Sequence, residues 1–115
     1  MEIQNLELWQ GDTWDIQVTV YDADNLPLDL TSWNIRSSIR KKYSDAVKTK
    51  DFTCSKVDAV NGILKLHLAA VDTDDLAKGS YVYDVELYKT VETEEYVYKP
   101  VGGRITVNPE ATKAA

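Results

Sequence analysis

Apolar and polar residues alternate with a period of two along most of this chain. The clearest stretch covers residues 13–20, and comparable stretches cover 33–40, 64–68 and 81–88. In the first stretch every second residue is apolar, namely Trp14, Ile16, Val18 and Val20. A period of two places alternate side chains on opposite faces of an extended strand, one face in a core and the other in solvent. The pattern therefore predicts a protein built mainly from β-strands.

Weaker signals predict shorter strands. Residues 47–53 carry the lysines of a protected edge strand. Asn61-Gly62 is a turn signal just before the strand that begins at residue 64. Residues 96–98 and 103–107 are expected to form two further strands, the first of them a hairpin partner of 81–88. These short strands complete the predicted set.

The alternation stops over residues 69–77. Val71 and Leu76 are spaced there like residues of one or two helical turns, and Asp72 or Thr73 could cap such a turn. We therefore expect one short helical turn in an otherwise extended chain.

Seven or eight short strands, and no helix long enough to cross between parallel strands, predict an all-β fold. The expected architecture is an antiparallel two-sheet sandwich, immunoglobulin-like in strand number and length. Trp33 is the candidate for a buried tryptophan between the sheets, and Tyr81 or Tyr83 for a tyrosine corner. The chain of 115 residues is predicted to form a single β-sandwich domain over 1–109, with a C-terminal tail over 110–115.

Composition and charge limit the classes of partner and the cellular location that we expect. The formal net charge of −6 disfavours nucleic acid and anionic lipid as partners. Cys54 is the only cysteine, so no intrachain disulfide can form. The N-terminus lacks the basic start and long apolar stretch of a signal peptide, and no apolar run approaches the length of a membrane span. Synthesis in a cytoplasm, without secretion and without a membrane or nucleic-acid partner, is expected.

Charges of opposite sign are separated along the chain. The basic cluster comprises Arg36, Arg40, Lys41, Lys42, Lys48 and Lys50. The acidic residues of the second half are Asp72, Asp74, Asp75, Glu92, Glu94 and Glu95. Two interpretations remain open: the clusters are solvated strand ends, or the basic edge of one copy meets the acidic edge of another.

Residues able to carry chemistry are few. The single histidine, His67, is predicted on the solvent face of a strand, and Cys54 has no histidine near it in sequence. Asp22, Asp24 and Asp29 could surround one turn as calcium ligands, but the glycine and distal glutamate of an EF-hand loop are absent. Gly102-Gly103 precedes a strand and not a helix, which disfavours a phosphate site. We predict no catalytic residue, no metal and no cofactor, hence a protein that is not an enzyme.

Four segments together resemble a family of small immunoglobulin-like β-sandwich domains in tailed-bacteriophage virion proteins, including the N-terminal domains of baseplate upper proteins. The segments are 10–13, 22–31, 79–87 and 103–107, and the resemblance extends from Leu6 to Thr112. Asn25 and Ser32 stand where the family commonly has glycine. The resemblance implies a non-enzymatic virion structural protein, made in the host bacterial cytoplasm, that assembles in the tail, baseplate or neck or on the capsid. Its implied partners are other virion structural proteins and further copies of itself.

Contact residues are predicted on the surfaces least committed to the core, including the N-terminal segment. The candidates are Leu6, Leu8, Trp9, Arg36, Arg40, Tyr88 and Tyr96. The N-terminal segment is unusually apolar for a chain end, so it is expected to pair with a sheet edge, either within the domain or on a neighbour. An alternative function is a carbohydrate- or receptor-binding module, which predicts that Trp9, Tyr43, Tyr88 and Tyr96 form one exposed patch.

Overall fold

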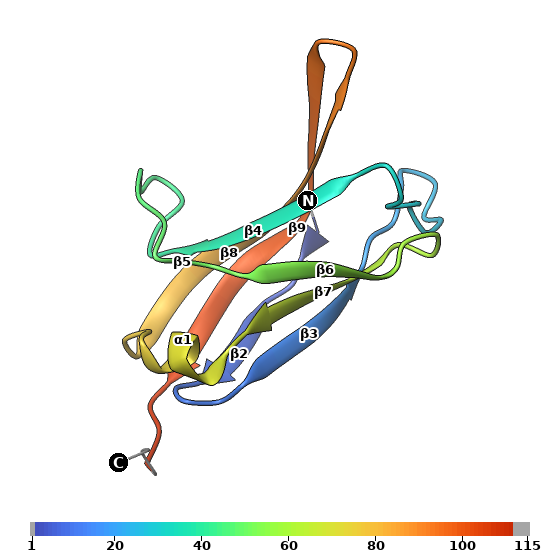
Figure 1. The fold of residues 1–115 in the computed structure, drawn as a ribbon. Helices are drawn as coiled ribbons and strands as arrows, with labels where there is room; N and C mark the ends of the chain where they lie inside the picture. Colours follow the sequence, from blue (N-terminus) through green and yellow to red (C-terminus); the bar gives the residue numbers. More distant parts are fainter. Residues whose placement is uncertain (1, 112–115) are drawn as a thin grey trace.

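The computed structural model describes residues 2–111 (Figure 1). Two β-sheets face each other, and one short helix closes the end of the sandwich opposite to a long hairpin. The elements in chain order are β1 (Glu2–Ile3), β2 (Leu6–Trp9), β3 (Trp14–Thr19), β4 (Asn34–Arg40), β5 (Lys50–Asp51), β6 (Thr53–Asp58), β7 (Ile63–Leu68), α1 (Ala70–Asp74), β8 (Gly79–Val91) and β9 (Glu94–Asn108).

The larger sheet has the strand order β1-β9-β8-β4-β5, with β2 also paired to β9, and the smaller sheet has the order β3-β7-β6. The predicted all-β two-sheet sandwich with one short helix is confirmed. Its pairs are antiparallel except those of β1 and β2, which run parallel to β9. The N-terminal segment therefore pairs with the last strand of its own chain.

The core lies between the sheets and follows the predicted alternation. In β7 the leucines Leu64, Leu66 and Leu68 are buried while the residues between them are half-buried. Tyr83 is the largest fully buried side chain, and its hydroxyl donates a hydrogen bond to the Gln4 carbonyl oxygen at 2.6 Å. That bond fixes the N-terminal segment to β8.

The predicted packing roles of the aromatic residues are met only in part. The Tyr81 hydroxyl donates to the carbonyl oxygen of Ala77 at 2.7 Å, a bond to the backbone a few residues upstream of the kind that defines a tyrosine corner. Trp33, in contrast, is only half-buried and packs against the core from outside. The expectation of a buried tryptophan between the sheets is therefore wrong.

Several predicted boundaries differ from the structure. The two strands expected at 96–98 and 103–107 are one continuous strand, β9, because a bulge accommodates Pro100. On β9 two residues, Lys99 and Pro100, lie opposite the single residue Glu86 of β8. A bulge leaves its extra residue unpaired, so the missing N–H of proline breaks no ladder bond there.

The edge strand predicted at 47–53 is also divided. β5 pairs with β4 in the larger sheet, and β6 pairs with β7 in the smaller one, so the chain changes sheets at Phe52. Helix α1 begins after Ala69 without a side-chain cap, and the Thr73 hydroxyl instead donates to the Asp12 carbonyl oxygen at 2.7 Å. Neither Asp72 nor Thr73 therefore acts as the predicted cap.

The last strand ends at Asn108, and residues 112–115 of the predicted tail lie outside the described residues. The division between domain and tail at 109 stays a prediction. No helix within residues 2–111 combines the length and the apolar character needed to span a membrane.

Candidate functional site

Strands β8 and β9 continue beyond the sandwich as a two-stranded ribbon, which we define as the arm, residues 88–98 (Figure 1). Up to Leu87, every second residue of β8 is buried, whereas all residues from Thr90 to Lys99 are exposed. The arm forms because its residues are rich in tyrosine, valine and threonine, which favour extended backbone. It presents both of its faces to solvent.

A two-residue loop closes the arm, since Val91 pairs with Glu94. Glu92, the first loop residue, has a φ of 58°, in the left-handed region. Two-residue hairpin loops need a positive φ at this position because only such turns match the twist of the strands, and glycine is the usual residue. The sequence here has a glutamate instead, and two more glutamates, Glu94 and Glu95, follow. The tip is therefore acidic.

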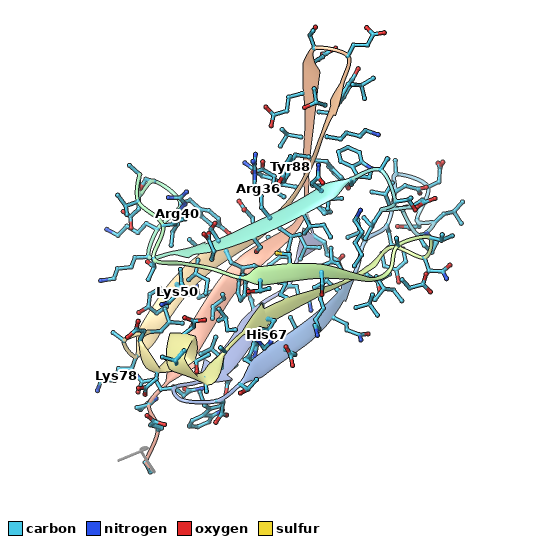
Figure 2. All side chains as sticks on the ribbon, viewed as in Figure 1. Arg36, Arg40, Lys50, His67, Lys78 and Tyr88 are labelled. Carbon is cyan, nitrogen blue, oxygen red and sulfur yellow. The ribbon has the colours of Figure 1, made fainter. Side chains whose placement is uncertain are left out.

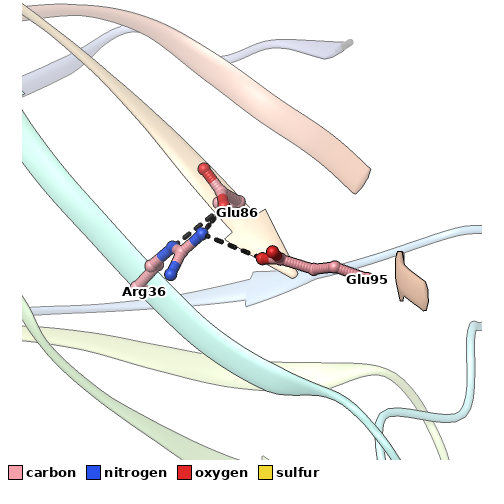
Figure 3. A network of polar contacts seen from close by, with 3 residues as sticks. All are labelled: Arg36, Glu86 and Glu95. Atoms are coloured by element: carbon pink, nitrogen blue, oxygen red, sulfur yellow. Dashed lines mark hydrogen bonds and ion pairs between the residues drawn. The ribbon is translucent and has the colours of Figure 1, made fainter. Parts of the chain in front are cut away.

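We call the part of the arm next to the sandwich, at Tyr88 and Lys89, its root. Arg36 of β4 contacts the root on the outer face of the larger sheet. The Arg36 Nε atom donates to Glu86 Oε1 at 2.9 Å, its Nη2 atom also contacts that oxygen, and Nη2 lies 3.7 Å from Glu95 Oε1 (Figure 3). The guanidinium carbon lies 4.1 Å from the centroid of the Tyr88 ring. The hydrogen bond from Arg36 to Glu86 raises the pKa of Arg36, and the nearby carboxylates act in the same direction.

A second cation holds the root on the opposite face. The Lys89 Nζ atom lies 4.3 Å from the centroid of the ring of Trp33, which is half-buried at the edge of the core. A cation over an aromatic face is attracted by the ring quadrupole. The root is thus held on both sides, while the ribbon beyond it projects away from the sandwich (Figure 1), with Glu95 near Arg36.

Next to the root, a hollow of about 680 Å³ opens on the outer face of the larger sheet, under the loop 41–49. Four basic side chains line it, Arg36, Arg40, Lys48 and Lys99, together with three acidic ones. The Tyr43 hydroxyl lies 3.3 Å from the carbonyl oxygens of Tyr83 and Gly103 and so holds the loop against the sheet. We call this feature the basic hollow.

Part of the predicted charge complementarity is satisfied within one chain. The Lys50 Nζ atom lies 3.3 Å from Asp75 Oδ2 and 3.5 Å from Asp72 Oδ1, and the acidic partners raise the pKa of Lys50. Arg36 and Glu95 form the second such pair. Arg40 makes a different contact, since its Nη1 atom donates to the Asp45 carbonyl oxygen at 3.0 Å and so closes the loop beside the hollow.

The residues considered for chemistry have partners within the fold. His67 Nδ1 contacts Asp15 Oδ1 on the neighbouring strand β3. Asp22 Oδ1 accepts the backbone N–H groups of Asp24 and Leu26 at 2.9 and 3.0 Å, as in a side-chain-stabilised turn. Burial raises the pKa of the Cys54 thiol to about 11. Within residues 2–111, no three histidine, cysteine or acidic side chains come together as a metal-binding group.

The seven predicted contact residues do not share one surface, and one of them, Arg40, lines the basic hollow. Leu6 and Leu8 are 8% and 1% exposed and belong to the core, so their side chains do not lie on a surface. They are buried because β2 pairs with β9 of the same chain. Trp9 is half exposed at the end of β2. Arg36 and Tyr88 meet at the root of the arm (Figure 2), and Tyr96 is on the arm itself. The contact prediction for these surface residues stays a prediction.

The four aromatic residues of the carbohydrate alternative do not share one patch. Trp9 pairs with Asn108 at one end of β9, whereas Tyr96 lies near the other end of that strand. An extended strand rises about 3.4 Å per residue, which separates these two rings by roughly 40 Å. Tyr43 holds the loop over the basic hollow. A single sugar platform is therefore not formed by these rings.

The arm and the hollow were not predicted from the sequence as such. A signal for the arm exists: Val97 on one face and Tyr96 and Tyr98 on the other leave neither face purely polar, unlike the strands of the body. No comparable signal exists for the hollow, because it depends on where the loop 41–49 lies on the sheet.

Two facing sheets of short, mostly antiparallel strands place the chain in the class of immunoglobulin-like β-sandwich domains. No protein-family model matches the chain, and no curated protein matches it. Among solved structures, it is similar to the N-terminal domain of phage TP901-1 ORF48, with a TM-score of 0.63 and 13% sequence identity over 91% of this chain and 85% of that one. The resemblance to phage sandwich domains noted in the sequence is thus confirmed at the level of the fold.

Proposed function

We propose that this protein is a structural component of a bacteriophage virion, and that it works through protein–protein contacts and not through catalysis. Two findings support the proposal: the fold is shared with a domain of a phage protein, and the sandwich carries a projecting arm. Its partners are other virion structural proteins and further copies of the chain. The tail, baseplate or neck is favoured over the capsid because the sequence resemblance includes baseplate proteins.

The observation that carries the proposal is the exposure of the arm. Val91, Tyr96, Val97 and Tyr98 are each between 41% and 51% exposed on a ribbon that packs on nothing beyond its root. A two-stranded ribbon in water gains little stability of its own, and grouped exposed apolar side chains mark protein contact sites. A ribbon of this kind is suited to dock on a partner.

Localisation tests the proposal directly. Phage particles are produced in a bacterial strain that carries the phage genome with this gene, and they are purified by density gradient. The protein in them is then quantified with an antibody. We expect the protein to copurify with the particles. A shortened variant, in which Asn-Gly replaces residues 90–95, should be equally abundant in the lysate and depleted from the particles.

The matched control is Val71→Ser, which changes a side chain that is 72% exposed on α1, at the end of the molecule opposite to the arm. This variant should enter particles like the wild type. Absence of the wild-type protein from particles, while it is abundant in the lysate, would overturn the proposed function.

A further inference from the structure

We propose, building on the proposed structural role, that the acidic tip of the arm of one copy docks in the basic hollow of a second copy. The two surfaces are different patches of the same chain, so the contact is head to tail. Contacts of this type generate closed rings or open filaments, depending on the rotation between neighbours.

The tip carries negative charge that the fold does not neutralise. Among residues 2–111, no basic side chain forms an ion pair with Glu92 or Glu94, and Glu94 only accepts a long hydrogen bond from the Tyr96 hydroxyl at 3.4 Å. Glu95, the third glutamate of the tip, lies 3.7 Å from Arg36. Two of the three tip carboxylates are therefore available to a partner.

The hollow carries the complementary charge. Lys99 lines it, and Lys42 belongs to the loop 41–49, which supplies other lining residues; neither lysine forms an ion pair with a carboxylate of the described chain. Arg40 faces the same hollow and uses one nitrogen on a backbone carbonyl. Val82 and Tyr43 add apolar surface to the lining, which suits the valine that precedes the tip glutamates.

Asp45 and Asp84 also line the hollow, and within residues 2–111 neither forms an ion pair. The positive charge in excess of theirs comes from Arg40, Lys99 and the loop residues Lys41 and Lys42.

Glu92 and Glu94, the outer carboxylates of the tip, form no ion pair with their own hollow in the described chain. The arm extends away from the sandwich, and the loop 41–49 projects from a different corner (Figure 1). Of the three tip carboxylates only Glu95 comes near a residue of its own hollow, Arg36, whereas no ion pair joins Glu92 or Glu94 to the described residues of the chain. The arm is held straight at its root by Arg36 on one face and Lys89 on the other. A hollow that receives Glu92 and Glu94 therefore belongs to another molecule, and the charges of the tip and the hollow fit a second copy of this chain.

Charge reversal in two separate variants tests the contact. Glu92→Lys with Glu94→Lys makes the tip basic, and Lys42→Glu with Lys99→Glu makes the hollow acidic. Purified proteins are compared at micromolar concentrations by size-exclusion chromatography with light scattering. The wild type should form oligomers that dissociate at high salt, and each variant alone should lose affinity by about a hundredfold, since like charges that meet cost several kcal/mol.

Mixing the two variants gives the decisive outcome. The basic tip of the first fits the acidic hollow of the second, and the acidic tip of the second fits the basic hollow of the first. Oligomers should therefore return only in the mixture. Failure of the mixture to assemble, when both variants keep the wild-type circular dichroism spectrum, would overturn the proposal.

Matched controls place the same charge changes elsewhere. Asp24→Lys with Asp74→Lys, and Lys65→Glu with Lys78→Glu, alter exposed or half-exposed side chains, and Lys78 lies at the end of the molecule opposite to the arm (Figure 2). Both controls should assemble like the wild type. A wild type that stays monomeric at every concentration overturns docking between copies, while its presence in virions would still stand, so the two proposals fail separately.

Discussion

Strands β8 and β9 each run through two regions, the body and the arm, which differ in how far their side chains are buried. In the body, β8 alternates buried and half-buried residues, with Leu87 and Val85 fully enclosed. A few residues further along the same strand, in the arm, Val91 is 47% exposed. The hydrogen-bonded ladder continues through both regions, so pairing alone does not distinguish them. What differs is whether a second sheet covers the ribbon.

The same pair of strands has two roles, one in each region. Where the smaller sheet covers it, the ribbon contributes buried apolar area and stabilises the fold. Where nothing covers it, the same ladder contributes little to folding, and its side chains are free to contact a partner. The junction between the two regions coincides with the β-bulge at Lys99 and Pro100.

The largest expected effect is a difference in the free energy of unfolding between two truncations in β8, one in the body and one in the arm. Leu87→Ala removes a fully buried side chain and should lower the free energy of unfolding by about 3 kcal/mol. Val91→Ala truncates an exposed side chain and should change it by no more than about 0.5 kcal/mol. Urea unfolding monitored by circular dichroism measures both values. Equal losses in the two variants would show that the arm is part of the cooperative core.

Thiol reactivity gives a second, kinetic comparison. Cys54 is half-buried in β6, and desolvation raises its pKa from 9.0 to about 11, with the charge of Asp51 acting in the same direction. At pH 8 its thiolate fraction should be about a hundredfold below that of an ordinary thiol, since each pKa unit is a factor of ten. Thr90→Cys adds an exposed thiol on the arm. In that variant we expect one fast and one slow reaction with a thiol reagent.

The same shift predicts how stability depends on pH. Between pH 9.0 and about 11 the unfolded thiol ionises while the folded one keeps its proton. The folded state then binds more protons, so stability falls as the pH rises through this window. Cys54→Ala should remove that part of the decline. A fast reaction of Cys54 in the native protein, at the rate of the arm cysteine, would contradict the partial burial of the Cys54 thiol.

The body was predictable because its strands bury one face, which leaves a period of two in the sequence. Leu64, Leu66 and Leu68 show that period, and the structure buries all three. The continuity of β9 was not predictable in the same way, because Pro100 and the following glycines are typical of strand breaks. Only the pairing with β8 shows that they lie at a bulge and within a strand.

The candidate site was harder to predict than the fold. Arg36 and Tyr88 were both identified as contact residues, but their stacking depends on the register between β4 and β8, which pairs Arg36 with Glu86 and Asn34 with Tyr88. The position of Trp33 early in a long strand predicts the buried tryptophan of immunoglobulin-like sandwiches, whereas in the structure it is half-buried with Lys89 over its ring. Such cation contacts join residues far apart in sequence and leave no local pattern.

The smallest expected effect lies at the root, where body and arm meet. A double-mutant cycle with Arg36→Ala and Glu86→Ala should give a coupling energy of about 0.5 kcal/mol, as for cross-strand charge pairs near a surface. The value is small because the Arg36 side chain is 53% exposed, although that of Glu86 is only 17% exposed. Urea unfolding of the four proteins at low salt measures it, and high salt should reduce it. A coupling of several kcal/mol would mean that the root stabilises the body as a core contact does, and that the arm is not energetically separate from the sandwich.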